Sequence, residues 1–264
     1  MEGNLKKMKV NWNQNSIDYI LKLGDVSILM NEQIGKKIKI SFAGQINCVV
    51  CGRLIKKAFA QGFCYPCFAK SAENSDCIIR PELCRGHLGE GRDVEWEKEN
   101  HVQPHVVYLA NSSGLKVGVT RSTQIPTRWI DQGASAAIIL AETENRYLAG
   151  TIEVALKEHF ADKTDWRKML KNERLEIDLL KEKEEAEYLL PIYLSGYFSD
   201  NNTLYNFNFP VKKYPTKITS MTLDKNPIVD GEFNGIKGQY LYIGDSGVIN
   251  IRNHSGYFVD IEFN

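Results

Sequence analysis

The sequence lacks any long hydrophobic run, and no stretch approaches the ~18 apolar residues that a membrane-spanning helix needs. The first residues, MEGNLKKMKVNWNQNS, contain no apolar signal core, so secretion is not expected. The 33 Lys and Arg residues balance the 33 Asp and Glu residues, which excludes a global attraction to nucleic acid. We therefore expect a cytoplasmic protein without membrane association, whose 264 residues are enough for two domains.

Acidic residues are absent between Gln33 and Glu73, which predicts a local basic patch. Phe59, Tyr65 and Phe68 are interleaved among its cations, a pattern typical of nucleic-acid binding. The alternative is a solvated face whose charges are balanced by acidic residues elsewhere in the fold. The candidate nucleic-acid contacts are the cations of this stretch and one arginine further along: Lys36, Lys37, Lys39, Arg53, Lys56, Lys57 and Arg121.

Cysteine is absent outside residues 48–84. Within them, Cys48 and Cys51 form one C-x-x-C pair, and Cys64 and Cys67 form another twelve residues later. This is the spacing of a zinc ribbon, in which two tight turns bring four thiolates around one ion. A pair of disulfides is the alternative, which a chain without a signal peptide disfavours. Because four thiolates leave no open position for a substrate, the Zn²⁺ would be structural.

A second group of metal-ligating residues follows the ribbon. Cys77, Cys84 and His87 precede two more histidines, His101 and His105. The simplest second site consists of the two cysteines, His87 and one later histidine, His101 being our choice. Alternatively, the cysteines are small buried hydrophobes and the histidines are exposed. The polar, glycine-rich loop GHLGEGRDVEWEKEN would stay disordered without a staple, which favours the metal site.

The remaining segments predict an α+β fold. Residues 1–47 and 191–264 read as short β-strands separated by turns, and we expect them to pair into one small barrel or sandwich. Between them come the cysteine-rich segment 48–104, an α/β domain over 105–173 and a connector helix over 174–190 with Leu175, Leu179 and Leu189 facing inward. Both the zinc ribbon-like segment and the α/β domain would thus be inserted between β-rich segments.

The segment from 105 to 160 predicts the order strand, strand, helix, strand, helix. HVVYLAN and LKVGVTR flank the turn of a hairpin, and Pro126 and Gly133 bound a short helix. Glu153 borders the apolar stripe of the last helix and needs a partner there. That partner is either a cation, with Arg128 and Arg146 as candidates, or a bound metal.

This order of elements resembles the GIY-YIG endonuclease domain. Tyr108 stands in the first motif strand, and Lys116 stands where the second motif strand usually has its tyrosine. Arg128, with Arg121 as a competitor, corresponds to the helix arginine, and Glu153 to the metal-binding glutamate. The resemblance implies a GIY-YIG-like α/β domain in which Tyr108 or Lys116 helps to deprotonate water. Arg128 would stabilise the phosphate charge, and Glu153 would hold Mg²⁺ or Mn²⁺.

The whole layout resembles domain-of-unknown-function family 2797. The motifs that carry this likeness are CVVCGR, GFCYPCF, CIIRPELC, PTRWIDQGA and the late GIKGQYL and GVINIR. The resemblance implies a cytoplasmic bacterial protein and supplies no activity. Three functions stay open: a metal-dependent endonuclease acting on DNA or RNA, a nucleic-acid-binding protein that does not cleave, and a non-catalytic zinc-stapled scaffold or protein-interaction module.

Overall fold

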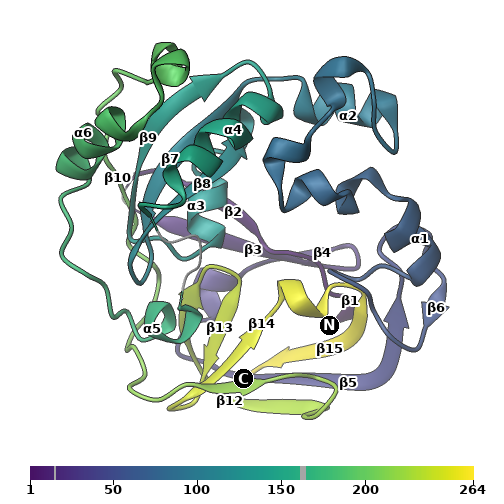
Figure 1. The fold of residues 1–264 in the computed structure, drawn as a ribbon. Helices are drawn as coiled ribbons and strands as arrows, with labels where there is room; N and C mark the ends of the chain where they lie inside the picture. The colour runs from purple at the N-terminus through teal and green to yellow at the C-terminus, as the bar shows by residue number, and fades with distance from the viewer. Residues whose placement is uncertain (15, 161–164) are drawn as a thin grey trace. The chain divides into compact units, whose positions relative to one another are not determined.

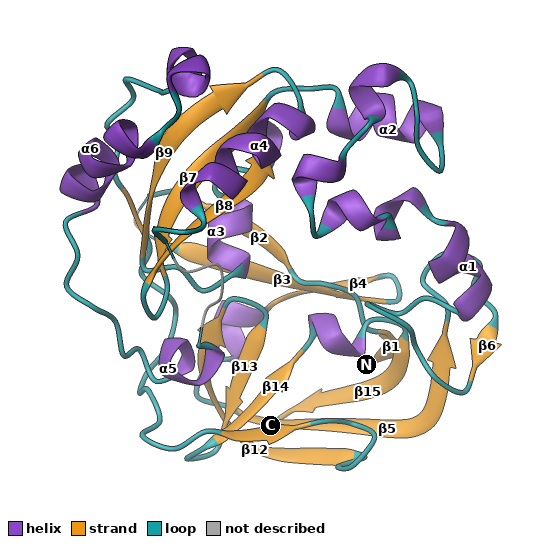
Figure 2. Cartoon of the chain, in the orientation of Figure 1, coloured by secondary structure: helices purple, strands orange, loops and turns teal. Residues whose placement is uncertain are grey.

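The computed structural model describes residues 1–14, 16–160 and 165–264, and the chain divides into two compact units. Unit 1 contains Met1–Ala69 and Asn208–Asn264, and unit 2 contains Lys70–Phe207. Residues 161–164, which belong to the predicted segment 105–173, lie outside the described residues, as does residue 15. Figures 1 and 2 show helices and several β-sheets in the same chain, which confirms the α+β class.

The main sheet of unit 1 joins the two ends of the chain. Its central strand is β5 (Lys37–Asn47), in which Ile38 and Ile40 are buried while the alternate lysines face outward. This strand pairs antiparallel with β12 on one side and β15 on the other. The sheet runs in the order β1-β15-β5-β12-β13-β14-β11, with the bounds β1 Glu2–Asn4, β11 Thr219–Met221, β12 Ile228–Lys237, β13 Tyr240–Ile243, β14 Gly247–Asn250 and β15 Tyr257–Phe263.

A smaller antiparallel sheet of unit 1 contains β2 (Lys9–Trp12), β3 (Ile17–Leu23) and β4 (Val26–Leu29). The middle strand β3 alternates buried Ile, Tyr and Leu side chains with more exposed ones, the period of two that one apolar face requires. A 3₁₀ turn, η1 (Met30–Gln33), leads from it to β5. This sheet contributes four fully buried side chains to the core of the unit: Ile17, Tyr19, Leu21 and Leu23.

The cysteine-rich segment does not form one body from residue 48 to residue 104. Its first part belongs to unit 1, because β6 (Leu54–Ile55) continues the ladder at the end of β5, with Ile46 opposite Ile55. The helix α1 (Tyr65–Lys70) follows. Its second part belongs to unit 2 and consists of 3₁₀ turns and one helix: η2 Ala72–Asn74, η3 Asp76–Ile78, η4 Pro81–Leu83, η5 Gly86–Leu88 and α2 Val94–His101.

The sheet of unit 2 has the order β10-β9-β7-β8, with β7 (His105–Asn111) hydrogen-bonded to both neighbours. One face of β7 and β8 (Leu115–Arg121) presents Val107, Leu109, Val117 and Val119 to the core. The helix α4 (Arg146–Leu156) adds Ala149, Ile152 and Leu156 to the same cluster. The other described elements are α3 Thr127–Asp131, β9 Ala136–Thr143, α5 Trp166–Leu170, α6 Leu179–Leu189, η7 Ile192–Tyr197 and β10 Tyr205–Asn206.

Two predicted elements differ in the structure. The helix expected over 174–190 begins only at Leu179, because the Asp178 side chain accepts hydrogen bonds from the first backbone N–H groups and caps it there. Leu175 therefore precedes the helix and is exposed. The expected strand PIYLSGYF is the 3₁₀ helix η7, in which the Ser195 hydroxyl donates to the Ile192 carbonyl.

Gly150 tests how tightly α4 packs on the loop that contains η4. A Cβ at this position would lie 2.3 Å from the Glu82 backbone nitrogen. Alanine favours a helix over glycine by about 1 kcal/mol, yet we expect Gly150→Ala to lower the free energy of unfolding by about 1–3 kcal/mol through this overlap. Urea denaturation measures the change. Gly196→Ala, where the added Cβ meets nothing within 4 Å, is the control; a Gly150→Ala variant more stable than the wild type contradicts the packing.

Candidate functional site

The first cysteine cluster lies where β5 ends and α1 begins. The Sγ atoms of Cys48, Cys51, Cys64 and Cys67 all lie within 4.8 Å of one another. The Cys51 and Cys64 sulfurs are 3.8 Å apart, too far for a disulfide of about 2.05 Å. Zinc–sulfur bonds of about 2.3 Å in a tetrahedron place two sulfurs about 3.8 Å apart. The cluster could therefore hold zinc, as the cysteine spacing predicts.

Backbone donors shape this cluster for thiolates. Gly52, in the left-handed conformation, closes the first turn, and its N–H donates to the Cys48 carbonyl. Burial raises the pKa of Cys48, but N–H groups of Cys51, Cys64 and Val50 oppose it and bring the pKa down to about 6. A proton shared with Cys64 raises the pKa of Cys67 to about 12. A bound cation removes this competition by holding every sulfur as a thiolate.

The strand part of the basic patch is balanced by acidic residues on neighbouring strands. Lys37 lies opposite Glu232 on β12, and Lys39 lies opposite Asp230 on β12 and Glu262 on β15. Cross-strand partners share one face of a sheet, so these charges offset one another. The absence of acidic residues from the local sequence therefore does not make this face of the sheet basic. Lys36, which precedes β5, donates a hydrogen bond to the Gln33 side chain.

The cations next to the cysteines are different. The Arg53 guanidinium donates to the Cys51 sulfur at 3.2 Å, and Lys57 lies over the Phe59 ring at 6.0 Å. The Phe59 ring also contacts Tyr65 and Phe68, at centroid distances of 5.4 and 6.0 Å. The exposed Tyr65, the half-buried Phe59 and Phe68, and the cations Arg53 and Lys57 thus lie in the same segment as the cysteine cluster, and Arg53 contacts it. We call this set, with Lys56, the knuckle surface.

The second cysteine cluster lies in unit 2. Its ligand atoms come from Cys77, Cys84, Glu97 and His101, and all lie within 4.8 Å of one another. The predicted set had His87 in place of Glu97. The His87 ring instead stacks on Tyr147, at a centroid distance of 4.7 Å. Glu97 escaped the sequence reasoning because it belongs to an acidic helix whose pattern indicates a solvated face, although its position four residues before His101 was a usable signal.

The last candidate histidine is a structural residue. His105 is fully buried at the start of β7, and its Nδ1 lies 2.7 Å from the Gln103 carbonyl. Burial lowers its pKa to about 4, so the ring is neutral at ordinary pH. Arg121, the competing candidate for the helix arginine, contacts the Asn100 side chain instead.

Tyr108 lies on β7 opposite Gly118 of β8. The phenol is fully buried and donates to the Gln132 side chain at 3.1 Å, and its hydroxyl would lie 2.7 Å from a Cβ at position 118. Glycine is therefore required at 118 by close approach. Burial raises the pKa of Tyr108, and the charge of Arg128 opposes this rise. The phenol is thus a poor base.

Lys116 lies opposite Ala110, two residues from Tyr108, on the face of the hairpin away from the valine and leucine core. The side chain is only 8% exposed and makes no ion pair or hydrogen bond within the described residues. Burial and then the charge of Arg128 lower its pKa to about 8, while the charge of Glu153 opposes the shift. Lys116, Arg128 and Glu153 therefore lie within electrostatic reach of one another.

The predicted Arg128–Glu153 and Arg146–Glu153 ion pairs are absent from the described residues. Lys157, which caps the end of α4, faces the Glu153 Oε2 atom with an N–O distance of 3.5 Å. Arg146 donates instead to the carbonyls of Cys77 and Ile78. The Glu153 Oε2 atom is buried and accepts no hydrogen bond, and burial raises the pKa of this carboxyl. That same Oε2 atom is the one that the Lys157 ammonium faces, so Glu153 has a cationic partner in the structure.

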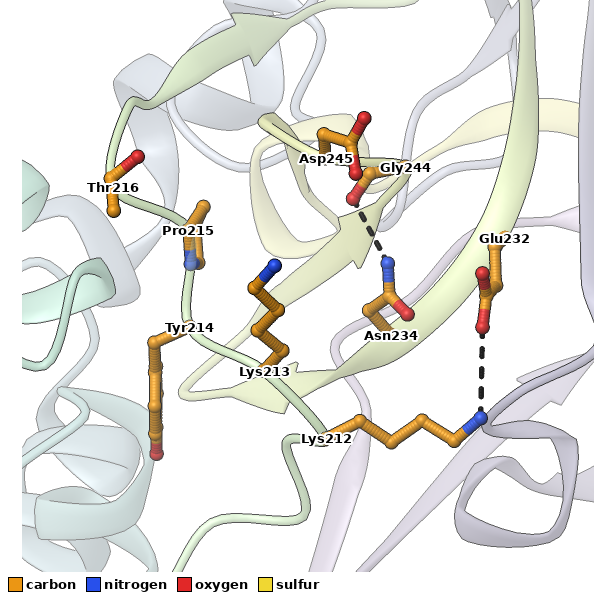
Figure 3. A pocket seen from close by; sticks show the side chains of 9 residues that line it. All are labelled: Lys212, Lys213, Tyr214, Pro215, Thr216, Glu232, Asn234, Gly244 and Asp245. Atoms are coloured by element: carbon orange, nitrogen blue, oxygen red, sulfur yellow. Dashed lines mark hydrogen bonds and ion pairs between the residues drawn. The ribbon is translucent and has the colours of Figure 1, made fainter.

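Unit 1 also contains a pocket of about 460 Å³, lined by residues 212–216, β12 and the turn after β13 (Figure 3). The Lys212 ammonium crosses to Glu232 at 3.6 Å, and the Asn234 amide donates to the Gly244 carbonyl. In Figure 3 the Lys213 side chain extends between Pro215 and Asn234, and it has no ion pair of its own among the described residues. The pocket is polar, with Tyr214 as its aromatic wall.

Two cysteine-containing clusters that could bind zinc suggest a metal-binding protein with an α+β fold. The chain belongs to the family described as "Protein of unknown function (DUF2797)", whose model matches residues 35–259. No curated protein and no solved structure matches the chain. Among the described residues, no helix has the length and apolar character needed to span a membrane.

The first cluster predicts zinc loss on removal of one thiolate. We expect Cys51→Ser to lose one zinc ion per chain and to lower the melting temperature, because three thiolates and a hydroxyl bind zinc more weakly than four thiolates. Elemental analysis of the purified protein and thermal unfolding measure both changes. Val50→Ala, at an exposed position between the paired cysteines, should keep its zinc. Equal zinc content in Cys51→Ser and wild type contradicts the assignment.

Lys116 predicts a pH-dependent stability. Its folded-state pKa lies below the ordinary 10.5, so the native state favours the neutral amine. The stability of the native state is therefore fully present above pH ~10.5, where the amine is neutral in both states. Part of this stability is lost as pH falls from ~10.5 to ~8, because the unfolded chain then takes up a proton that the buried amine does not. We expect Lys116→Met to raise the free energy of unfolding by about 1–3 kcal/mol at pH 7. The gain should shrink towards pH 10. Denaturant midpoints of both proteins, with the exposed Lys181→Met as control, test this; an identical gain at both pH values contradicts it.

Proposed function

We propose that this protein is a zinc-containing nucleic-acid-binding protein whose unit 2 contacts a phosphate of the backbone through Lys116 and Arg128. The observation that carries the proposal is that Lys116 and Tyr108 share one face of the hairpin and that the Arg128 charge acts on both, while neither cation has an ion-paired carboxylate among the described residues. Because the charge of Arg128 lowers the pKa of Lys116, an anion bound to both would relieve their repulsion. A phosphodiester is such an anion.

The burial of Lys116 without an ion pair supports a ligand role. A buried, unpaired ammonium destabilises a fold unless something else requires it. Lysine replaces the tyrosine expected from the resemblance to the GIY-YIG domain, so the position exchanges a phenol for a phosphate-binding group. Perturbed ionisable groups that gather at one place are typical of functional sites.

The knuckle surface offers a second contact for nucleic acid. Its exposed Tyr65 can stack on a base, and Arg53 and Lys57 can contact phosphates. The balanced lysines of β5 take no part in this surface. The zinc ion would keep its two turns in place and would not itself contact the ligand.

Cleavage is a further candidate activity at the Lys116 site, favoured by the buried Oε2 atom of Glu153, which accepts no hydrogen bond and has only the Lys157 ammonium, at 3.5 Å, to exchange for a metal ion. That oxygen and a phosphate together would hold Mg²⁺ or Mn²⁺, which when bound polarises a non-bridging phosphate oxygen. Arg128 would stabilise the developing charge. Lys116, with a pKa of about 8, is a better acceptor of the water proton than Tyr108, whose burial disfavours the phenolate.

A non-catalytic scaffold that binds another protein is the alternative. It is favoured by the exposed apolar side chains of Val50 and Leu54 beside the cysteines. On this alternative the knuckle surface contacts a protein, and Glu153 only pairs with Lys157.

Labelled single-stranded, double-stranded and structured nucleic acids separate these functions. We expect the wild type to bind at least one of them, and Lys116→Met to weaken binding about tenfold, the effect of about 1.4 kcal/mol, and to reduce the salt slope by about 1. Glu153→Gln should retain binding. If the site cleaves, this variant should lose cleavage in Mg²⁺ or Mn²⁺ by about 100-fold or more.

Lys181→Met is the matched control, because it removes an exposed lysine of the same unit. Fluorescence anisotropy measures binding, and denaturing gels measure cleavage. Binding that all three variants share with the wild type would contradict the assignment of Lys116. Absence of binding to every nucleic acid would leave the protein-binding scaffold in its place.

A further inference from the structure

We infer that Cys77, Cys84, Glu97 and His101 bind a second metal ion, of the Zn²⁺ class, which fastens residues 76–101 to the helix that carries Glu153. The inference concerns the architecture of unit 2 and stands whether or not the protein binds nucleic acid. It replaces the predicted ligand His87 with Glu97. It also assigns a positioning role to the loop, which the sequence pattern does not indicate.

The distances between the donor atoms fit a single tetrahedral ion. The His101 Nδ1 atom lies 3.5 Å from the Cys84 sulfur and 3.8 Å from the Cys77 sulfur. Bonds of about 2.3 Å to sulfur and 2.0–2.1 Å to nitrogen place these atoms about 3.5–3.6 Å apart in a tetrahedron. Glu97 lies one helical turn before His101 on α2, so both side chains point to the same place.

The burial of the four ligands requires a cation. All of them are at most 7% exposed. Two thiols and a carboxylate are acidic ligands, and His101 is the only described residue that forms an ion pair with Glu97. Burying a carboxylate beside thiolates costs several kcal/mol unless the charge is neutralised. A divalent ion bound to all three offsets two of their three negative charges and takes one ligand atom from each.

The segment has no hydrophobic core that could hold it in place. Within residues 70–93, all of which the structure describes, the large aliphatic side chains of Ile78, Ile79, Leu83 and Leu88 are exposed. The buried residues there are small or are ligands: Ala72, Cys77, Pro81, Cys84 and Gly86. Short 3₁₀ turns supply its regular structure. A metal ion supplies the cross-links that such a segment otherwise lacks.

The metal-held loop is bonded to α4. The Arg146 guanidinium donates to the Cys77 and Ile78 carbonyls, both at 2.9 Å, so the first ligand lies directly beside the helix. One turn later, Gly150 lets the backbone of Pro81 and Glu82 approach the helix. Glu153 follows Gly150 by three residues, on the same side of α4. The ion would therefore hold the loop against α4, and the loop would in turn position the helix that carries Glu153.

Glycines leave room for Glu97 as a ligand. A Cβ at Gly91 would lie 2.4 Å from the Glu97 Cγ, and a Cβ at Gly86 would lie 3.4 Å from the Glu97 Cβ. The Ser75 hydroxyl lies 3.3 Å from the Cys77 sulfur and orients it. His87, by contrast, is occupied by its stacking on Tyr147.

Metal content of the full-length protein tests the assignment. We expect two zinc ions per chain in the wild type, and one in Cys84→Ser and in Glu97→Gln, because each variant removes one anionic ligand. His87→Ala is the control for a neighbouring histidine and should keep both ions. Cys51→Ser should also lose one ion, but from the first cluster. A wild type with one ion, unchanged in Cys84→Ser, would overturn the inference.

Cobalt substitution provides a readout that does not depend on stability. Thiolate-to-cobalt charge-transfer absorption reports how many sulfurs bind the ion. In Cys51→Ser, which retains the second site intact, Co²⁺ bound there should show the absorption of two thiolates. Adding Glu97→Gln to this background should abolish that absorption, even if the chain remains folded. Unchanged absorption in the double variant would remove Glu97 from the ligand set.

The positioning role is tested by hydrogen exchange. We expect Glu97→Gln to raise amide exchange over residues 76–86 and in α4, while exchange around Cys48 and Cys64 stays as in the wild type. His87→Ala should change neither region. Exchange confined to α2 in the Glu97→Gln variant would contradict the coupling of the ion to the helix.

Discussion

Buried thiolates and carboxylates that meet at one point demand a cation, and this demand governs both cysteine-containing parts of the chain. In unit 1 the demand arises where β5 ends and the backbone donors around Cys48 favour its charged form. In unit 2 it arises in a loop whose aliphatic side chains face solvent. The unit 2 loop buries no large aliphatic side chain between residues 70 and 93. If each cluster holds an ion as proposed, metal binding and folding are one process in both parts, which belong to different compact units.

The hairpin of β7 and β8 in unit 2 presents the opposite situation, because the cations Lys116 and Arg128 there have no ion-paired carboxylate among the described residues. The charge of Arg128 lowers the pKa of Lys116, and Gly118 leaves room for the Tyr108 phenol, whose hydroxyl would lie 2.7 Å from a Cβ at that position. Such a site lowers stability until an anion binds. Under the proposed assignments, the protein would combine two sites that gain stability from a cation with one that gains it from a phosphate. This is the arrangement expected of a scaffold that holds a strained binding site.

Local signals predicted much of this structure, and long-range pairing explains what they missed. The spacing of Cys48, Cys51, Cys64 and Cys67 is sufficient for the first cluster because both turns are encoded within a few residues. The alternation in residues 105–121 likewise specifies the hairpin. Lys37 is balanced by Glu232, which lies nearly two hundred residues further along the chain. The local absence of acidic residues between 33 and 73 therefore predicted a basic face on β5 that the structure does not have. Glu97 was missed because helical spacing alone does not show which acidic residue turns towards a buried sulfur.

The central claim is that each of the two clusters holds its own metal ion. Diffraction from crystals of the full-length protein, recorded just above and just below the zinc absorption edge, tests it directly. The account predicts two anomalous peaks per chain, one among the four cysteines of unit 1 and one among Cys77, Cys84, Glu97 and His101. A single peak in unit 1, with the Glu97 carboxylate turned away from the sulfurs, would contradict it. That result would leave unit 2 to be held by protein contacts alone.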